Sequence, residues 1–496
     1  MATTNELETI PLIIDGKRTT SSPSKTFAVY GLEEQREVYL AESANVEAAN
    51  QAAEASWKTF QMWKTSSVVT RRKLLQRYAE LLRKHEEDLV QTQRLETSVI
   101  EMWARKNVHL AADLIEETAA CISRLAGEIP QTQTPSSLAL AFTVPVGPVL
   151  SIAPQVSPIP HTANSGRRRK WNSAVILGAR SLATPVAAGC TVVFKASELS
   201  PKTHHLLVEI FKEAGLPDGV INVVQTRRED APSVTEALVA HPAIRKVEFI
   251  GSAPVGRIIG QLGGKYLKPV LMELGGKGPA IVLADADLAD AAKKCVTGAF
   301  LHHGQLCFST ERVIVVKAVA DQFKELLKQV APTFTTGSGV SDRIIEASRE
   351  KLIDAEKKGA QFLIGGPDKA SASALQPTIV MGIKENMPLF DEEAFGPSFT
   401  LYVADDDAKA IAIANNTAYG LNAAVHSSNM QHALDVAKQI DTAQVHINSM
   451  TAHDEPTLPV GGTKGSGWGR NNAMWGLQEF SEIKLITVSM KGNSFI

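Results

Sequence analysis

The chain has 496 residues, of which 44% are hydrophobic and 21% charged, and its formal net charge is −2. This length exceeds the roughly 100–200 residues of an ordinary domain, so we expect more than one hydrophobic core. The nearly balanced charge creates no global field for a polyanion, which argues against nucleic acid as the main partner.

The chain begins without a recognisable targeting segment. Residues 1–10 include Glu6 and Glu8 and have no basic start followed by an apolar run. No later segment approaches about 18 uninterrupted apolar residues, the length that a membrane-crossing helix needs. We therefore expect a soluble, cytoplasmic protein with no membrane partner.

A helical region opens the chain and gives way to alternating strands and helices. Over residues 46–126, apolar residues recur every three or four positions among charged ones, as in amphipathic helices. From Phe142 onward, short β-branched runs alternate with amphipathic stretches and turns. We predict strands around residues 144–152, 191–195, 220–224 and 246–250, and helices at 204–214 and 255–262. This order is typical of a parallel sheet wound with helices.

The second half of the chain repeats the same rhythm. We predict further strands at 280–283, 312–317, 361–364 and 445–447, and helices at 288–301, 319–330 and 430–439. The pattern therefore indicates a second parallel α/β unit.

Residues 155–170 do not fit this pattern. They have neither a helical nor a strand period, and they end in four consecutive positive charges at 167–170. Such a stretch is typical of a solvated loop. One interpretation is a surface insertion, which a loop accommodates at little cost in free energy. Another is an anion-binding or nuclear-localisation patch.

The four cysteines are widely spaced and form no C-x-x-C pair, which disfavours disulfides and structural zinc and predicts no metal site. Cys307 differs from Cys121, Cys190 and Cys295 in its sequence context. The segment Gly-Gln-Leu-Cys-Phe-Ser-Thr-Glu-Arg at 304–312 places it between a helical stretch and a strand. A lone cysteine is usually a packing residue, so its functional weight depends on other motifs.

Four other motifs accompany this cysteine. They are Val-Val-Phe-Lys-Ala-Ser-Glu at 192–198, Gly-Ser-Ala-Pro-Val-Gly at 251–256, Glu-Leu-Gly-Gly-Lys at 273–277 and Glu-Ala-Phe-Gly-Pro at 393–397. In order and spacing the set resembles the aldehyde dehydrogenase superfamily over roughly residues 10–490, including the glycine-rich run at 461–470. The loop at 225–231 replaces a glycine-rich turn and is similar to the salicylaldehyde and vanillin dehydrogenase-like branch.

The resemblance implies a catalytic set of Cys307, Glu273 and Asn172. A Cys307 thiolate would attack the aldehyde carbon, and the Asn172 amide and the Cys307 N–H would stabilise the oxyanion. Loss of hydride gives a thioester, for whose hydrolysis Glu273 would activate water. A carboxylate between apolar neighbours can have a raised pKa if the site is desolvated. The expected function is NAD(P)-dependent oxidation of an aldehyde, with an aromatic or conjugated one as the first choice and aliphatic ones left open.

The resemblance also implies the cofactor site, although the common G-x-G-x-x-G fingerprint is absent. Helix N–H groups bind anions, and in the family Ser252 and the helix after it face the phosphates. A ribose-binding carboxylate at Glu198 would repel a 2′-phosphate, so we expect NAD rather than NADP. The implied cofactor-binding residues are Trp171, Lys195, Ser197, Glu198, Gly251, Ser252, Gly256, Glu393 and Phe395.

The most serious departure from the family lies at the oxyanion side chain. The family has an uninterrupted Ile-x-Pro-Trp-Asn segment, whereas here residues 155–170 separate Pro154 from Trp171 and Asn172. Removing them restores the family pattern, which gives a third interpretation of the stretch, a translated intron retained in the gene model. Sequencing the transcript decides this, because messages that contain the stretch would exclude a retained intron.

We therefore expect an α/β, aldehyde dehydrogenase-like fold. It comprises a doubly wound, Rossmann-like NAD-binding domain (1–129 and 149–272), an α/β catalytic domain (273–455) and a small oligomerisation extension (130–148 and 456–496). In this family residues near 130–148 and 484–490 pair between subunits, which implies a homodimer or homotetramer. Three alternatives stay open: a binding protein whose catalysis the insertion impairs, a thioesterase or esterase without a redox step, and acylation of coenzyme A.

Overall fold

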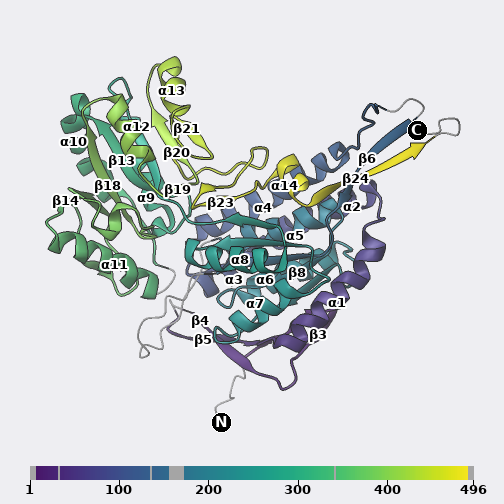
Figure 1. Ribbon diagram of the computed structural model, residues 1–496. Helices are drawn as coiled ribbons and strands as arrows, with labels where there is room; N and C mark the ends of the chain where they lie inside the picture. The colour runs from purple at the N-terminus through teal and green to yellow at the C-terminus, as the bar shows by residue number, and fades with distance from the viewer. Residues whose placement is uncertain (1–6, 32–33, 134–136, 156–172, 340–341, 490–496) are drawn as a thin grey trace, which may run out of the picture.

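The computed structural model describes residues 7–31, 34–133, 137–155, 173–339 and 342–489. Two large, mainly parallel sheets, each covered by helices, form the body of the molecule (Figure 1). The predicted α/β fold with parallel sheets is therefore confirmed. The atypical segment lies outside the described residues from position 156 onward.

The first sheet has eight strands, and its five central strands are parallel. In spatial order they are β23 (Gly467–Trp468), β11 (Val270–Glu273), β10 (Lys246–Gly251), β7 (Val149–Gln155), β8 (Val192–Lys195), β9 (Ile221–Val224), β2 (Leu12–Ile14) and β3 (Lys17–Thr19). The sequence predicted β7 to β10 but not β11, whose four residues show no alternation. It also missed the short strands that precede residue 46, which include β2 and β3.

Helices cover both faces of this sheet because successive strand residues point to opposite sides. Val192 packs in a core with α2 (Val68–Lys84), α4 (Glu101–Cys121), α5 (Ala174–Ala188) and α6 (Pro201–Glu213). Its neighbour Val193 packs in a second core with α1 (Val46–Trp63), α7 (Ala231–Ala240) and α8 (Ala253–Tyr266). The sheet is therefore doubly wound, and α1, α2 and α4 confirm the predicted helical opening.

The second sheet has seven strands in the order β14 (Gln361–Ile364), β17 (Thr378–Met381), β18 (Ser398–Ala404), β13 (Thr310–Val316), β12 (Gly278–Val282), β20 (Ala423–His426) and β21 (Val445–Ile447). All neighbours are parallel except β14 and β17. α9 (Leu288–Phe300) and α10 (Ala320–Val330) cover one face, whereas α12 (Asp407–Asn415) and α13 (Met430–Ala437) cover the other. The predicted elements of this half are confirmed; β17, β18 and β20 were not anticipated.

A long two-stranded sheet extends away from the body at the upper right of Figure 1. It consists of β6 (Ser137–Pro145) and β24 (Ser481–Ser489), which pair antiparallel over nine residues within one chain. The strand predicted around 144–152 includes the start of β7, but its continuation across 146–148 is wrong, because β6 ends at Pro145 and β7 starts at Val149. Gly147 has φ +127° and Pro148 has no N–H, so the intervening turn cannot continue a ladder. Pairing of these segments between subunits stays a prediction.

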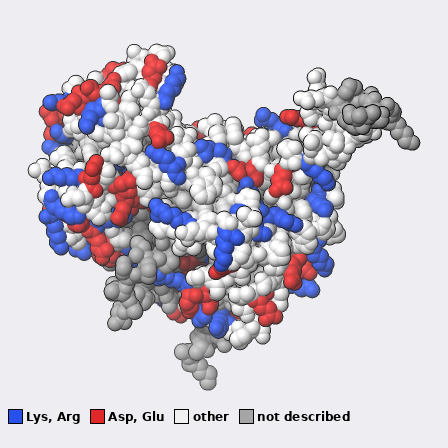
Figure 2. All heavy atoms as spheres, in the orientation of Figure 1, with Lys and Arg blue, Asp and Glu red and all other residues white. Residues whose placement is uncertain are grey.

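Positive and negative side chains are intermixed over both units on the face shown in Figure 2, where the described residues form no large patch of one sign. Within the described ranges, no helix has the combination of length and apolar character needed to cross a membrane.

Candidate active site

The carboxyl ends of neighbouring strands in the first sheet bring several predicted residues to one edge. Lys195 ends β8, Gly251 ends β10 and Glu273 ends β11. In open parallel sheets ligands bind outside the carboxyl ends of the strands. This edge is therefore the place where a ligand site is expected.

Cys307 reaches this edge from the second unit. It follows the short helix η2 (Leu301–Gly304) and precedes β13, and its Sγ lies 3.8 Å from Glu273 Oε1. His302, His303 and Gly304 are consecutive left-handed residues that turn the chain toward the cysteine. A Cβ at Gly304 would lie 2.1 Å from the Gly396 carbonyl oxygen, so this turn requires glycine.

Two cavities meet at Cys307. The first, of about 760 Å³, is lined by Cys307, Glu273, Gly251, Ser252, Glu393 and Phe395 among others. The second, of about 630 Å³, has apolar and aromatic side chains that include Trp103, Leu110, Leu177 and Phe308. Its polar lining residues besides Cys307 are Lys106, Asn107, Ser173, His453 and Asp454. A reacting carbon at Cys307 is thus accessible from two sides, one of which is lined by four of the predicted cofactor residues, Gly251, Ser252, Glu393 and Phe395.

Burial is the main cause of the shifted pKa values of Glu273 and Cys307. It raises the pKa of Glu273 above its ordinary value, and the nearby Arg180 guanidinium opposes that rise. Burial also raises the pKa of the Cys307 thiol well above its ordinary value, and the carboxylates of Glu273 and Glu393 add to this effect. In the absence of a bound ligand, a carboxylate this close thus stabilises the neutral thiol, and a proton is available for transfer between them.

Several buried polar atoms near the strand ends lack partners in the described part of the chain. They are Lys195 Nζ, Glu198 Oε2 and Ser252 Oγ. Burial lowers the pKa of Lys195 to about 8, while Glu198 acts in the opposite direction. A buried donor and acceptor without partners are costly unless a ligand completes them. Ribose hydroxyls would satisfy Lys195 and Glu198, and Ser252 at the start of α8 faces a helix N-terminus suited to phosphate, so these residues fit a dinucleotide.

The other predicted cofactor residues have identifiable structural settings. Ser197 Oγ accepts a hydrogen bond from Leu199 N at 3.2 Å. A Cβ on Gly256 would lie 2.7 Å from the Leu274 side chain, so glycine lets α8 pack closely beside Glu273.

Glu393 and Phe395 lie on a loop across the first cavity. Gly276 N donates to Glu393 Oε1 at 3.2 Å, and burial followed by the Glu311 charge raises the pKa of Glu393 to about 8. Glu311 holds this loop, because its carboxylate accepts from Ala394 N at 2.8 Å and from Lys277 Nζ at 2.6 Å. The loop that faces the cofactor side is thus anchored to the segment that carries Cys307.

The model of the aldehyde dehydrogenase family matches residues 19–486 of the chain. The chain belongs to the aldehyde dehydrogenase family. A vanillin dehydrogenase from Pseudomonas sp. is 38% identical to it over 97% of this chain and 98% of that protein.

Solved aldehyde dehydrogenases share the fold. A salicylaldehyde dehydrogenase from Pseudomonas putida, crystallised with salicylaldehyde, has a TM-score of 0.91 and 34% identity and covers 99% of this chain and 100% of its own. An aldehyde dehydrogenase from Bacillus cereus, solved as a complex with NAD+, has a TM-score of 0.90 and 27% identity and covers 98% and 97%. The predicted family and its salicylaldehyde and vanillin dehydrogenase-like branch are therefore confirmed.

Two predicted site residues of this aldehyde dehydrogenase, Trp171 and Asn172, lie outside the described residues. The predicted oxyanion side chain therefore stays a prediction.

One charged residue in direct contact with Glu273 belongs to none of the sequence motifs. Arg180 lies on α5, is fully buried and donates from Nη2 to Glu273 Oε2 at 2.6 Å. The sequence could have indicated such a contact, because Arg180 is the only charged residue in the apolar run at 174–188. An arginine is seldom buried without a partner. Asp454, which also contacts Arg180, had no comparable signal, because it lies in an irregular segment.

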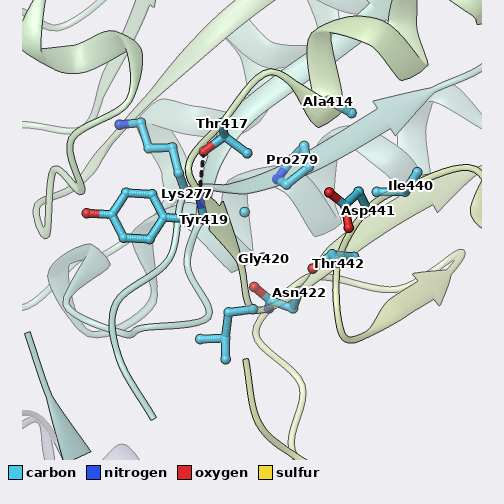
Figure 3. A pocket seen from close by; sticks show the side chains of 12 residues that line it. Lys277, Pro279, Ala414, Thr417, Tyr419, Gly420, Asn422, Ile440, Asp441 and Thr442 are labelled. Carbon is cyan, nitrogen blue, oxygen red and sulfur yellow. Dashed lines mark hydrogen bonds between the residues drawn. The ribbon is translucent and has the colours of Figure 1, made fainter. Parts of the chain in front are cut away.

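A smaller pocket beside β12 is separate from this site. Figure 3 shows it among Pro279, Thr417, Asn422 and Asp441, with Tyr419 N donating to Thr417 Oγ1 at 3.2 Å. Its empty volume is about 220 Å³, and neither Cys307 nor Glu273 lines it. The Asp441 carboxylate is already paired with Lys464 at 3.3 Å. This pocket therefore adds no group to the chemistry at Cys307.

Proposed function

We propose that this aldehyde dehydrogenase oxidises an aromatic aldehyde to its carboxylic acid with NAD, using Cys307 as the nucleophile and Glu273 as the general base. The observation that carries the proposal is the 3.8 Å contact between Cys307 Sγ and the buried Glu273 carboxylate, at the junction of two cavities. The first cavity would hold the cofactor, and the second would hold the substrate.

In the first half-reaction the Cys307 thiol transfers its proton to Glu273, and the sulfur forms a bond to the aldehyde carbon. The carbonyl π electrons move to oxygen, which gives a thiohemiacetal oxyanion. Donors near that oxygen, with the Cys307 N–H and the Asn172 amide as our candidates, stabilise the charge; losing one such donor typically costs about 100-fold to 1,000-fold in rate. A bound nicotinamide supplies the acceptor for the hydride that leaves this carbon.

In the second half-reaction the carbon is a thioester on Cys307. Glu273, after returning its proton to solvent, takes a proton from water while the water oxygen attacks the carbonyl carbon. The carbon–sulfur bond then breaks, the departing sulfur takes the proton from Glu273 to regenerate the thiol, and the acid leaves. The raised pKa of Glu273 makes its carboxylate a stronger base than an ordinary glutamate, which favours both of these proton transfers.

The residues proposed to hold NAD are distributed along the first cavity and the strand ends. Lys195 and Glu198 would bind the adenosine ribose hydroxyls, Ser197 lies between them, and Gly251, Ser252 and Gly256 would admit the pyrophosphate to α8. Glu393 and Phe395 would contact the nicotinamide ribose and ring, with Trp171 as a further candidate. The Glu198 carboxylate supports NAD over NADP, because it would repel a 2′-phosphate.

The aromatic substrate class rests on the second cavity. Trp103 and Phe308 give it flat apolar walls, on which an aromatic ring can pack edge-to-face or offset-stacked. The related proteins are named for vanillin and salicylaldehyde, both aromatic aldehydes. This agreement supports an aromatic rather than an aliphatic aldehyde as the preferred substrate.

A panel of aromatic and aliphatic aldehydes with NAD and with NADP tests the proposal. We expect aldehyde-dependent NADH formation, a carboxylic acid product without added coenzyme A, and the highest kcat/KM for aromatic aldehydes. A protein that hydrolyses esters but forms no NADH with any aldehyde would contradict the redox function. A preference for short aliphatic aldehydes would contradict the substrate class alone.

A further inference from the structure

Arg180 is the centre of a buried network behind Glu273. Its Nη2 donates to Glu273 Oε2 at 2.6 Å, and its Nη1 lies 3.3 Å from both Asp454 Oδ2 and Asn472 Oδ1. Asn472 Nδ2 in turn donates to Asp454 Oδ1 at 2.8 Å. The guanidinium is thus held from two sides while one of its nitrogens contacts the carboxylate proposed as the base.

The network has a defined arrangement because its members come from separate elements. Arg180 projects from α5, Glu273 ends β11, and Asn472 immediately precedes α14 (Ala473–Glu479). Arg180 and Asn472 have no exposed surface. A planar guanidinium that contacts fixed acceptors on both sides has little freedom to rotate. The Glu273 oxygen that it contacts is therefore fixed, which leaves Oε1 facing Cys307.

The charges around Arg180 keep it ionised. Burial alone would lower its pKa, but the carboxylates of Glu273, Asp454 and Glu248 outweigh this effect and raise the pKa. Glu248 lies on β10 beside β11, where Ser151 Oγ donates to its Oε2 at 2.9 Å. Arg180 thus supplies a permanent positive charge among three acidic side chains, of which Glu248 and Glu273 are buried and Asp454 is partly exposed.

We propose that Arg180 is a positioning residue that orients Glu273 and sets the pH at which Glu273 acts as a base, with Asp454 moderating its effect. The inference rests on the proposed function of Glu273. It assigns no direct contact with substrate to Arg180. The contact with Arg180 also explains how a deeply buried carboxylate is stabilised in its ionised form.

The direction of each effect follows from charge. The groups that face Glu273 are Arg180 from α5, Asp454 from the loop after β21, Cys307 from the loop before β13 and Glu248 from β10. A positive neighbour stabilises the carboxylate and lowers its pKa, whereas negative neighbours raise it. Removing the Arg180 charge should therefore raise the pKa of Glu273, and removing the Asp454 charge should lower it.

The direct test is an infrared titration of the Glu273 carboxyl band in the full chain, with Glu273→Gln as the blank that identifies the band. In Arg180→Met we expect the pKa of Glu273 to rise by about 1–3 units, the usual effect of losing an adjacent opposite charge. Arg180→Lys keeps the positive charge but cannot contact Glu273 and Asp454 at the same time as a guanidinium does, so it should raise the pKa of Glu273 by less. Asp454→Asn should lower the pKa, by about one unit or less.

The same variants are then compared by the pH dependence of kcat. The acid limb of the profile should move to higher pH in Arg180→Met and to lower pH in Asp454→Asn, while the exposed control Arg77→Met should match the wild type. Loss of a buried partner is destabilising, so Asp454→Asn keeps the test decisive if Arg180→Met does not fold. Unchanged Glu273 titration in Asp454→Asn and Arg180→Lys, or shifts of the same sign in both, would overturn the inference.

The infrared titration needs no turnover, so its outcome is separate from that of the proposed function. If the wild type forms no NADH with any aldehyde, the proposed function fails, and the titration still decides whether Arg180 controls the Glu273 carboxyl. If NADH forms but the titration is insensitive to Arg180 and Asp454, the inference about Arg180 alone fails.

Discussion

Single residues in this site owe their chemistry to burial. Glu273 is 2% exposed, and its desolvation raises its pKa above the ordinary range of a glutamate. The same desolvation acts on the Cys307 thiol, whose raised pKa means that it needs a base in contact rather than spontaneous ionisation. The proposed nucleophile and the proposed base thus share one desolvated environment, and the proposed reaction needs both of them.

This dependence predicts the behaviour of Glu273→Gln. The amide keeps the shape of the side chain but cannot accept the proton of water, so steady-state turnover should fall by about 100-fold to 10,000-fold. Turnover and NADH formation are measured under saturating NAD and aldehyde. The exposed control Glu80→Gln should retain wild-type turnover; a Glu273→Gln rate within about twofold of it would remove Glu273 from the role of base.

Cofactor choice is predicted to depend on Glu198. Replacing it by glutamine removes the negative charge that would face a 2′-phosphate, so kcat/KM with NADP should rise by about tenfold relative to NAD, equivalent to about 1.4 kcal/mol. The measurement is the ratio of the two kcat/KM values for wild type and variant. An unchanged ratio would show that Glu198 does not contact the adenosine ribose.

At the scale of elements, the paired strands β6 and β24 present apolar side chains to solvent. Ile483 is 70% exposed and Leu485 is 59% exposed on β24, although both are large and hydrophobic. Exposed apolar surface that extends from the body is typical of a protein interface. It supports the predicted homodimer or homotetramer, in which this extension packs against another copy.

The predicted interface can be disrupted on β24 itself. Because a buried unpaired carboxylate is strongly disfavoured in an apolar interface, Ile483→Asp combined with Leu485→Asp should convert the oligomer to smaller species. Light scattering after size-exclusion chromatography gives the mass, with the neighbouring Lys484→Ala as the control. A wild type that is monomeric, or an oligomer insensitive to both aspartates, would contradict the prediction.

A separate prediction concerns the deletion of residues 155–170. If Asn172 supplies an oxyanion donor, the inserted residues separate it from Pro154, and a displacement of about 1 Å can cost about 100-fold in rate. Deleting 155–170 joins Pro154 to Trp171 and should therefore raise kcat. The deletion variant and the full chain are compared with the same aldehyde and NAD; equal or lower activity of the deletion variant would contradict the expectation.

At the scale of the whole molecule, the site exists because two sheets approach each other. Glu273 comes from the first sheet, Cys307 precedes a strand of the second, and Glu393 lies on a loop of the second that contacts Gly276. This arrangement accounts for the pair of cavities that meet at one sulfur atom. The proposed catalysis therefore depends on the relative placement of both units.

The sequence allowed prediction of those strands, helices and motifs that depend on a local pattern of residues. The strands β8, β9 and β10 are short β-branched runs next to turns, and the motifs around Glu273 and Cys307 identify the family. It could not predict β11 as a strand, since four residues carry too little periodicity. The Arg180 contact with Glu273 joins positions far apart in the chain, which no local pattern specifies. The break between β6 and β7 depends on Gly147 and Pro148, a turn that the apolar run obscured.

The central claim is that the substrate carbon becomes bonded to Cys307. Its most direct test is peptide mass spectrometry of the unsubstituted chain, quenched with acid during turnover with NAD and an aromatic aldehyde, because acid preserves the thioester that has formed but has not yet been hydrolysed. We predict that the peptide with Cys307 gains the mass of the acyl group, that the gain requires NAD, and that hydroxylamine removes it. An unmodified Cys307 peptide, or an acyl group found instead on Cys121, Cys190 or Cys295, would contradict the account.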